Sequence, residues 1–211
     1  MAKYIIISGV DGSGKTTVIE GVRKQLEADG KKVGYIWMRY NFRLIRILHA
    51  IAKITGLSYK EKTGMGLMWL HRFYKSKLFC WFYIRCSYID NWMARKKPVR
   101  LAKAKELDYV ICDRWVNDIV IDLGSETHKM DILDSKWYKK FQSLLPIESF
   151  QFVVIRHRQK VLDCRVENTF NEAFNYRFDL YQKIVEKPEV NMIDNTGTIE
   201  NSIQQVLNIL N

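Results

Sequence analysis

Apolar and polar positions divide the chain into short apolar runs and longer stretches with a helical repeat. Five runs predict strands, at residues 4–7, 32–38, 109–112, 150–155 and 190–193. Apolar residues three and four positions apart predict helices between them, over 15–28, 42–55, 160–186 and 198–210, with one or two more over 65–93. Strands separated by helices form parallel βαβ units, so the pattern predicts an α/β fold in which a parallel five-stranded sheet carries helices on both faces.

The first strand leads into a glycine-rich segment that fits the P-loop motif G-x-x-x-x-G-K-[ST]. Its residues are Gly9, Val10, Asp11, Gly12, Ser13, Gly14, Lys15, Thr16 and Thr17. Glycines let the backbone wrap around a phosphate with N–H groups pointing inward, and the following helix adds its positive N-terminus. Lys15 is then expected to reach the β- and γ-phosphates, and Thr16 to bind Mg²⁺. The segment predicts ATP and Mg²⁺ as ligands and a P-loop NTPase fold.

Polar residues follow the later strands, at the sheet edge where parallel sheets bind ligands. They are Arg39, Asp113, Arg114, Arg156, Asn195 and Thr196. Asp113 ends a buried apolar run, and we expect it to act with Thr16 on Mg²⁺ as a Walker B carboxylate does. Arg114 is expected to hold phosphate, with an ion pair to Asp113 or Asp118 as the alternative. An ATP contact and an exposed basic turn are alternatives for Arg156.

Length and charge narrow the class of protein. The 211 residues suit one domain, 1–211. A net charge of +11 favours polyanionic partners such as phosphates or nucleic acid, with a solvated basic surface as the alternative. The four cysteines have no C-x-x-C spacing, the chain opens without a signal peptide, and its apolar stretches are too short to span a bilayer. We therefore expect a cytoplasmic protein with no membrane partner.

An aromatic and basic segment covers residues 69–92. Such residues at helical spacing are typical of a core face or a dimer contact, which makes a homodimer the expected assembly. Stacking on the bases of a single nucleic acid strand is the alternative.

The motifs resemble those of the thymidylate kinase family. The segment 9–17 matches its G-x-D-G-S-G-K-T-T loop, and 110–115 matches its D-R-aromatic motif. Residues 113–122 fit the D-R-Y-x-x-D-x-x-x-D pattern of divergent thymidylate kinase-like relatives. Residues 193–197 look like the family's adenine-side loop, and Leu162 and Arg165 like the start of its LID. In place of the family's E-P-G-G-T, the chain carries Arg39-Tyr40-Asn41-Phe42.

This resemblance implies a nucleoside monophosphate kinase that uses Mg·ATP, with dTMP as the first acceptor to consider. It implies that Lys15 and the 12–14 amides hold the donor phosphates, while Thr16 and Asp113 position Mg²⁺. It also implies acceptor contacts from four side chains, Asp11, Arg39, Arg114 and Asp118. Two further readings remain open: a P-loop nucleic-acid protein, such as a polynucleotide 5′-kinase or a regulatory ATPase, and a non-catalytic member that binds ATP without turnover.

Overall fold

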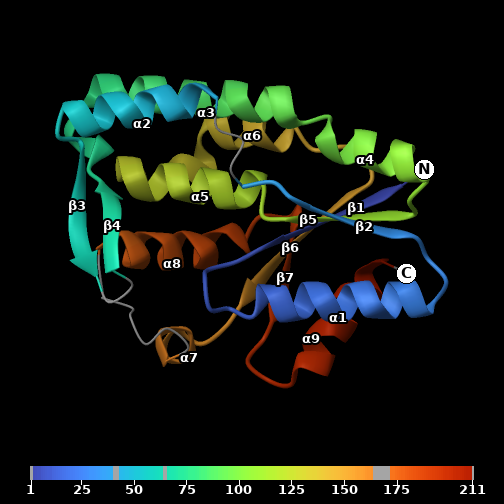
Figure 1. Cartoon of the computed structure of the whole chain (residues 1–211). Coiled ribbons are helices and arrows are strands. Elements are labelled where there is room, and N and C mark those ends of the chain that lie inside the picture. Colours follow the sequence, from blue (N-terminus) through green and yellow to red (C-terminus); the bar gives the residue numbers. More distant parts are fainter. Residues whose placement is uncertain (1, 40–42, 64–65, 164–171, 211) are drawn as a thin grey trace.

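A computed structural model of the chain describes residues 2–39, 43–63, 66–163 and 172–210. Its main sheet contains five parallel strands in the order β2-β5-β1-β6-β7. The strands are β1 (Lys3–Ser8), β2 (Val33–Trp37), β5 (Tyr109–Asp113), β6 (Ser149–Ile155) and β7 (Val190–Asp194). The predicted parallel five-stranded sheet of a P-loop NTPase-like α/β fold is therefore confirmed, and Figure 1 shows it between two helical layers.

One layer consists of α1 (Lys15–Ala28) and α9 (Ile199–Leu210), which pack together against the sheet. Helix α1 begins directly after the P-loop and buries Val18, Ile19, Val22 and Leu26, which repeat with helical spacing. Gly30 follows its end with a φ of 74°, a conformation that costs glycine little. The predicted boundaries 15–28 are confirmed.

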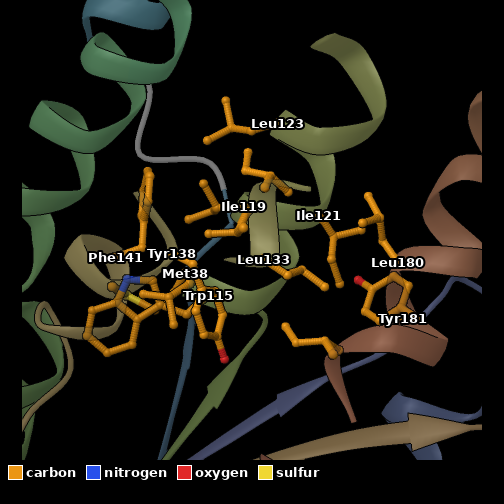
Figure 2. Packing of buried hydrophobic residues seen from close by; sticks show 14 of the residues in the cluster. Met38, Trp115, Ile119, Ile121, Leu123, Leu133, Tyr138, Phe141, Leu180 and Tyr181 are labelled. Atoms are coloured by element: carbon orange, nitrogen blue, oxygen red, sulfur yellow. The ribbon is translucent and has the colours of Figure 1, made fainter. Parts of the chain in front are cut away.

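The other layer covers the opposite face of the sheet (Figure 1). Its helices are α2 (Leu44–Ile54), α3 (Lys77–Ala94), α4 (Lys97–Lys105), α5 (Val116–Thr127), α6 (Lys136–Gln142) and α8 (Glu172–Ile184). Trp115 lies fully buried at its centre, among Met38, Ile119 and Phe141, as Figure 2 shows. Burial of this large ring at the start of α5 anchors the strand end that carries Asp113.

Two segments differ from the sequence prediction. Residues 58–71 form an antiparallel hairpin of β3 (Ser58–Thr63) and β4 (Gly66–His71), whereas we had expected a helix from residue 65. Pairing between the two strands overrides the local helical repeat because each strand satisfies the backbone of the other. The predicted helix 160–186 corresponds to α7 (Arg158–Asp163), which begins two residues earlier, and α8, and Arg165, expected in a LID, lies outside the described residues.

Helices α4, α5 and α6 were not predicted. Pro98 stands in the first turn of α4, where its missing N–H costs nothing, instead of only marking the end of α3. Over the described ranges, no helix combines the length and apolar character that crossing a bilayer requires. Cys80, Cys86 and Cys112 are free thiols.

Candidate nucleotide site

The P-loop and the predicted Walker B carboxylate lie side by side because β1 and β5 are parallel neighbours. Ile7 of β1 pairs with Asp113, the last residue of β5. The carboxyl ends of the two strands therefore bring the start of the loop and the Asp113 carboxylate to one edge of the sheet. Figure 1 shows α1 leaving this edge.

Glycines give the loop its shape. Gly9, Gly12 and Gly14 have φ values of 149°, 90° and 91°. A Cβ on Gly9 would lie 2.6 Å from the Val154 carbonyl oxygen, so the loop also needs glycine there for space. The Ser13 N–H donates to the Val10 carbonyl at 3.1 Å, which closes the turn.

Lys15 reaches back over this turn. Its side chain is buried, and Nζ donates to the Val10 carbonyl at 2.9 Å and lies 3.8 Å from an Asp11 carboxylate oxygen. A buried ammonium needs polar partners, and phosphate oxygens would supply stronger ones than a carbonyl.

The residues present fit a Mg²⁺–nucleotide. Thr16 is exposed at the start of α1, and Ser13 Oγ is buried with no hydrogen-bond partner in the described part of the chain. Gly14 precedes α1 as its N-cap and has no side chain to occupy the first-turn amides. The hydroxyl of Thr16 and the carboxylate of Asp113 are hard oxygen donors, as Mg²⁺ requires. When bound, Mg²⁺ would neutralise charge on the phosphate oxygens.

Asp113 has a hydrogen-bond partner that the motifs did not indicate. The hydroxyl of Tyr35 on β2 donates to Asp113 Oδ2 at 2.7 Å. Burial raises the pKa of the Asp113 carboxyl above its usual value, while Tyr35 and Lys15 act in the opposite direction. The pKa of Tyr35 is raised by burial and by this carboxylate, so the phenol remains a donor.

Arg114 joins the loop to α5. Its backbone has a φ of 58°, and its N–H donates to the Ile7 carbonyl at 3.0 Å. Its guanidinium forms an ion pair with Asp11 and another, at 3.3 Å, with Asp118. The ion-pair alternative for Arg114 and Asp118 is therefore present in the structure, together with a contact to the P-loop.

Asp118 lies behind Arg114, with only 1 % of its surface exposed. It also accepts from the backbone N–H of Trp115 at 3.3 Å and from the Tyr181 hydroxyl at 2.6 Å. With both of its oxygens engaged, Asp118 holds Arg114 and the start of α5 in place.

Carboxylates continue along α5 at four-residue spacing. Asp122 accepts three hydrogen bonds from Arg39, one at 2.9 Å and two at 3.1 Å, and pairs with Arg177 of α8 at 3.1 Å. Glu126 pairs with Arg177 at 3.8 Å and accepts from the Tyr83 hydroxyl. Burial, and then Asp122, raises the pKa of Glu126. We call this run, Arg114-Asp118-Asp122-Glu126, the α5 ladder.

The residues predicted to contact ATP follow β6 and β7, on the other side of β1 from β5. Arg156, after β6, lies 3.4 Å from the Gly12 carbonyl through Nη1. Asn195, after β7, donates to the Ser13 carbonyl at 2.7 Å, and the Thr196 carbonyl accepts from Lys160. The structure thus brings both predicted strand-end loops to the P-loop.

Sequence reasoning missed several residues that contact this site, among them Tyr35, Arg177, Tyr181 and Ser202. The i, i+4 spacing of Arg177 and Tyr181 matches that of the carboxylates on α5, and this shared spacing is a signal that could have paired the two helices. Tyr35 and Ser202 give no such signal, because each reaches its partner across the tertiary fold.

The aromatic segment divides between core and surface. Phe73, Phe79 and Tyr83 are buried, which confirms the core interpretation for them. The outer side of α3 exposes a stripe of large apolar residues, Leu78, Trp81, Phe82, Ile89, Trp92 and Met93. Helix α2, which packs beside α3, exposes Ile47, Ile51 and Ile54. We call these nine residues the α2/α3 face.

Comparison with known proteins finds a similarity that spans nearly the whole chain. No family model matches the chain. The chain is similar to a protein of Mycoplasma mobile named thymidylate kinase, with 25 % identity over 217 residues that cover 95 % of each chain. Because the similarity extends over nearly the whole of both chains, it supports a resemblance to nucleotide kinases that goes beyond the P-loop.

Proposed function

We propose that this protein is a Mg·ATP-dependent nucleoside monophosphate kinase of the thymidylate kinase type. The observation that carries the proposal is the placement of Lys15, Asp113 and Arg114 at one edge of the sheet, around the amides of the P-loop. Phosphoryl transfer needs charge neutralisation and alignment more than covalent chemistry from the protein. The similarity to a thymidylate kinase makes dTMP the first acceptor to test.

On the donor side, Lys15 and the loop amides hold the phosphates, and Thr16 and Asp113 position Mg²⁺. Arg156, Asn195 and Thr196 belong to the loops that flank the donor. The acceptor phosphate itself attacks the γ-phosphoryl group, so no histidine or cysteine nucleophile is needed.

On the acceptor side, Arg114 and Arg39 supply positive charge, and Asp11 and Asp122 hold them. A guanidinium has five N–H donors in a planar fork, a geometry that matches phosphate oxygens as well as carboxylate oxygens. Asp118 contributes by orienting Arg114.

The test is ATP-dependent phosphorylation of a panel of nucleoside monophosphates, with Lys15→Ala as the inactive variant. Lys24→Ala, an exposed lysine on the same helix, is the matched control and should keep wild-type activity. Turnover of no monophosphate by the wild type, or unchanged turnover in Lys15→Ala, would reject the proposal.

The proposal includes a homodimer formed by the α2/α3 face. Large exposed apolar areas on one side of a protein are typical of interaction sites. The exposed residues lie on two helices that pack against each other, and two copies related by a two-fold axis can bury the same residues against each other.

A P-loop protein that binds nucleic acid is the second candidate function, and the distribution of positive charge along the chain supports it. Residues 43–105 contain fifteen Lys and Arg but only two acidic residues, Glu61 and Asp90. This segment forms α2, the hairpin, α3 and α4, so these elements carry a strong excess of positive charge. Binding to single-stranded oligonucleotides that weakens steeply with salt would support it, and absence of binding near physiological salt would remove it.

A further inference from the structure

The Asn195 side chain lies beneath the P-loop, and each of its polar groups is engaged. Nδ2 donates to the Ser13 carbonyl at 2.7 Å, and Oδ1 accepts from Ser202 Oγ of α9 at 2.9 Å. Its backbone N–H donates to the Ile155 carbonyl of β6 at 2.9 Å. Both Asn195 and Ser202 are buried. The side chain is therefore fixed at both ends, and its amide is turned toward the loop.

Asn195 also touches the residue that follows Ser13. A Cβ on Gly14 would lie 2.3 Å from Asn195 Nδ2, far inside contact distance. The loop and the asparagine are thus packed as closely as a glycine allows. Residues 14 and 195 are far apart in sequence, so β7 and α9 carry this contact to the loop.

Peptide geometry gives the contact a consequence for phosphate binding. In a trans peptide the C=O and the next N–H lie in one plane and point in opposite directions. A hydrogen bond that holds the Ser13 carbonyl toward Asn195 therefore turns the Gly14 N–H away from Asn195. A loop amide with a fixed direction binds an oxyanion without first being ordered, whereas a rotating peptide loses that advantage.

We propose that Asn195, held by Ser202, is a positioning residue that orients the peptide link between Ser13 and Gly14 for the β-phosphate of the nucleotide. This inference rests on the proposed function and deepens it. It also changes the role implied by family resemblance, since Asn195 serves the phosphate side of the site and not the adenine. Ser202 acts through Asn195, and α9 becomes part of the machinery that shapes the P-loop.

The experiment compares the binding of ADP and of inorganic tripolyphosphate by calorimetry near physiological salt. The proteins are wild type, Asn195→Ala, Asn195→Asp and Ser202→Ala, with Asn201→Ala, an exposed asparagine on α9, as the control. Binding that remains in Lys15→Ala is subtracted as non-specific. Asn195→Asp keeps the size of the side chain but lacks the N–H donor.

Because Asn195→Ala loses one buried hydrogen bond, we expect its affinity for ADP to fall about tenfold and its affinity for tripolyphosphate to fall by the same factor. The affinity for both probes should fall at least as much in Asn195→Asp and about threefold in Ser202→Ala. It should not change in Asn201→Ala. In ¹⁵N-labelled protein, ADP should shift the Gly14 amide proton of the wild type, and this shift should shrink in the Asn195 variants.

If Asn195 contacted adenine, its variants would bind ADP more weakly while their affinity for tripolyphosphate stayed unchanged. That pattern would overturn the inference. Unchanged affinity for both probes in folded Asn195 variants would also overturn it. If Asn195→Ala does not fold, the probe affinities of Ser202→Ala and the ADP-induced shift of the Gly14 amide proton in Asn195→Asp test the inference. Failure of the wild type to bind ADP would instead reject the proposed function, and this inference with it.

Discussion

Single side chains at the site act through partners that lie outside the motifs. Tyr35 is the clearest case, because its hydroxyl holds one oxygen of Asp113. The Tyr35→Phe variant should keep the fold but leave the carboxylate free to rotate. We expect the Mg²⁺ concentration for half-maximal activity to rise about threefold to tenfold, the effect of losing one hydrogen bond of ordinary strength at an exposed position.

The measurement for Tyr35→Phe is the Mg²⁺ dependence of the rate, together with Mn²⁺ binding in the presence of ADP. Tyr59→Phe, on the hairpin, is the control. Equal Mn²⁺ affinity in wild type and Tyr35→Phe would show that Asp113 does not need this phenol.

Asp11 is the second residue whose effect the structure defines. Its carboxylate pairs with Arg114 and lies 3.8 Å from Lys15 Nζ. We expect Asp11→Ala to raise the acceptor KM about tenfold or more, since Arg114 loses its position, while ATP affinity stays unchanged or improves slightly as a negative charge leaves the phosphate site.

Steady-state kinetics with each substrate varied in turn, and the melting temperature, test Asp11→Ala. A joint loss of ATP affinity and thermal stability would mean that Asp11 mainly supports the loop itself.

At the scale of elements, the α5 ladder connects α5 to α8, α3 and the end of β2. Asp122 is its centre, because it pairs with both Arg39 and Arg177. Replacing Asp122 with Ala would leave two largely buried guanidinium groups facing each other. We expect a loss of about 2 kcal/mol in the free energy of unfolding, below the full cost of breaking a buried pair because the groups are partly exposed.

Urea unfolding measures this loss, and Asp134→Asn is the control. Asp134 pairs with Lys187 on the surface, where an ion pair contributes little. Equal unfolding midpoints for Asp122→Ala and Asp134→Asn would show that the ladder is not stabilising.

His71, the last residue of β4, is expected to make the free energy of unfolding depend on pH. Its ring stacks on Phe73 and His49, and Nδ1 lies 2.7 Å from Ser58 Oγ. Burial lowers the pKa of His71 from 6.5 to about 4. Between pH 6.5 and 4, His71 therefore binds a proton more readily in the unfolded chain than in the folded one. Its contribution to the free energy of unfolding is fully present above pH 6.5 and is lost as the pH falls toward 4. The expected loss between pH 7 and 4.5 is about 2–3 kcal/mol.

Urea unfolding at several pH values tests this prediction, with His71→Gln expected to reduce the slope between pH 6.5 and 4, while His49, whose pKa burial also lowers, keeps part of it. His157→Gln, at an exposed position, should leave the slope as in the wild type. A wild-type slope in His71→Gln would assign the pH dependence to other groups.

At the scale of the whole molecule, the α2/α3 face predicts the assembly. Leu78 and Ile54 are 68 % and 87 % exposed, and such residues are stabilised by burial against a second copy. Introducing charge with Trp81→Glu and Trp92→Glu should convert a dimer to monomers in sedimentation experiments, with the circular dichroism spectrum unchanged. A wild-type monomer at micromolar concentration would contradict the proposal.

Much of this protein follows from its sequence, because the governing interactions are local or general. The order of glycines and Lys15 defines the P-loop, because only glycine adopts these backbone conformations easily. Apolar runs define buried parallel strands, and the rule that ligands bind at the carboxyl ends of strands then places Asp113, Arg114, Arg156 and Asn195 at one edge.

The tertiary structure alone decided which groups these residues meet. The hairpin at 58–71 exists because two strands complete each other's hydrogen bonds, which no local repeat encodes. Tyr35 reaches Asp113 across neighbouring strands, and Asn195 reaches Ser13 from the far end of the chain. Such contacts depend on the order of the strands in the sheet, which sequence spacing does not encode. The spacing of residues therefore identifies the chemical groups of the site, and the packing of β2, β7, α5 and α8 determines which partners those groups contact.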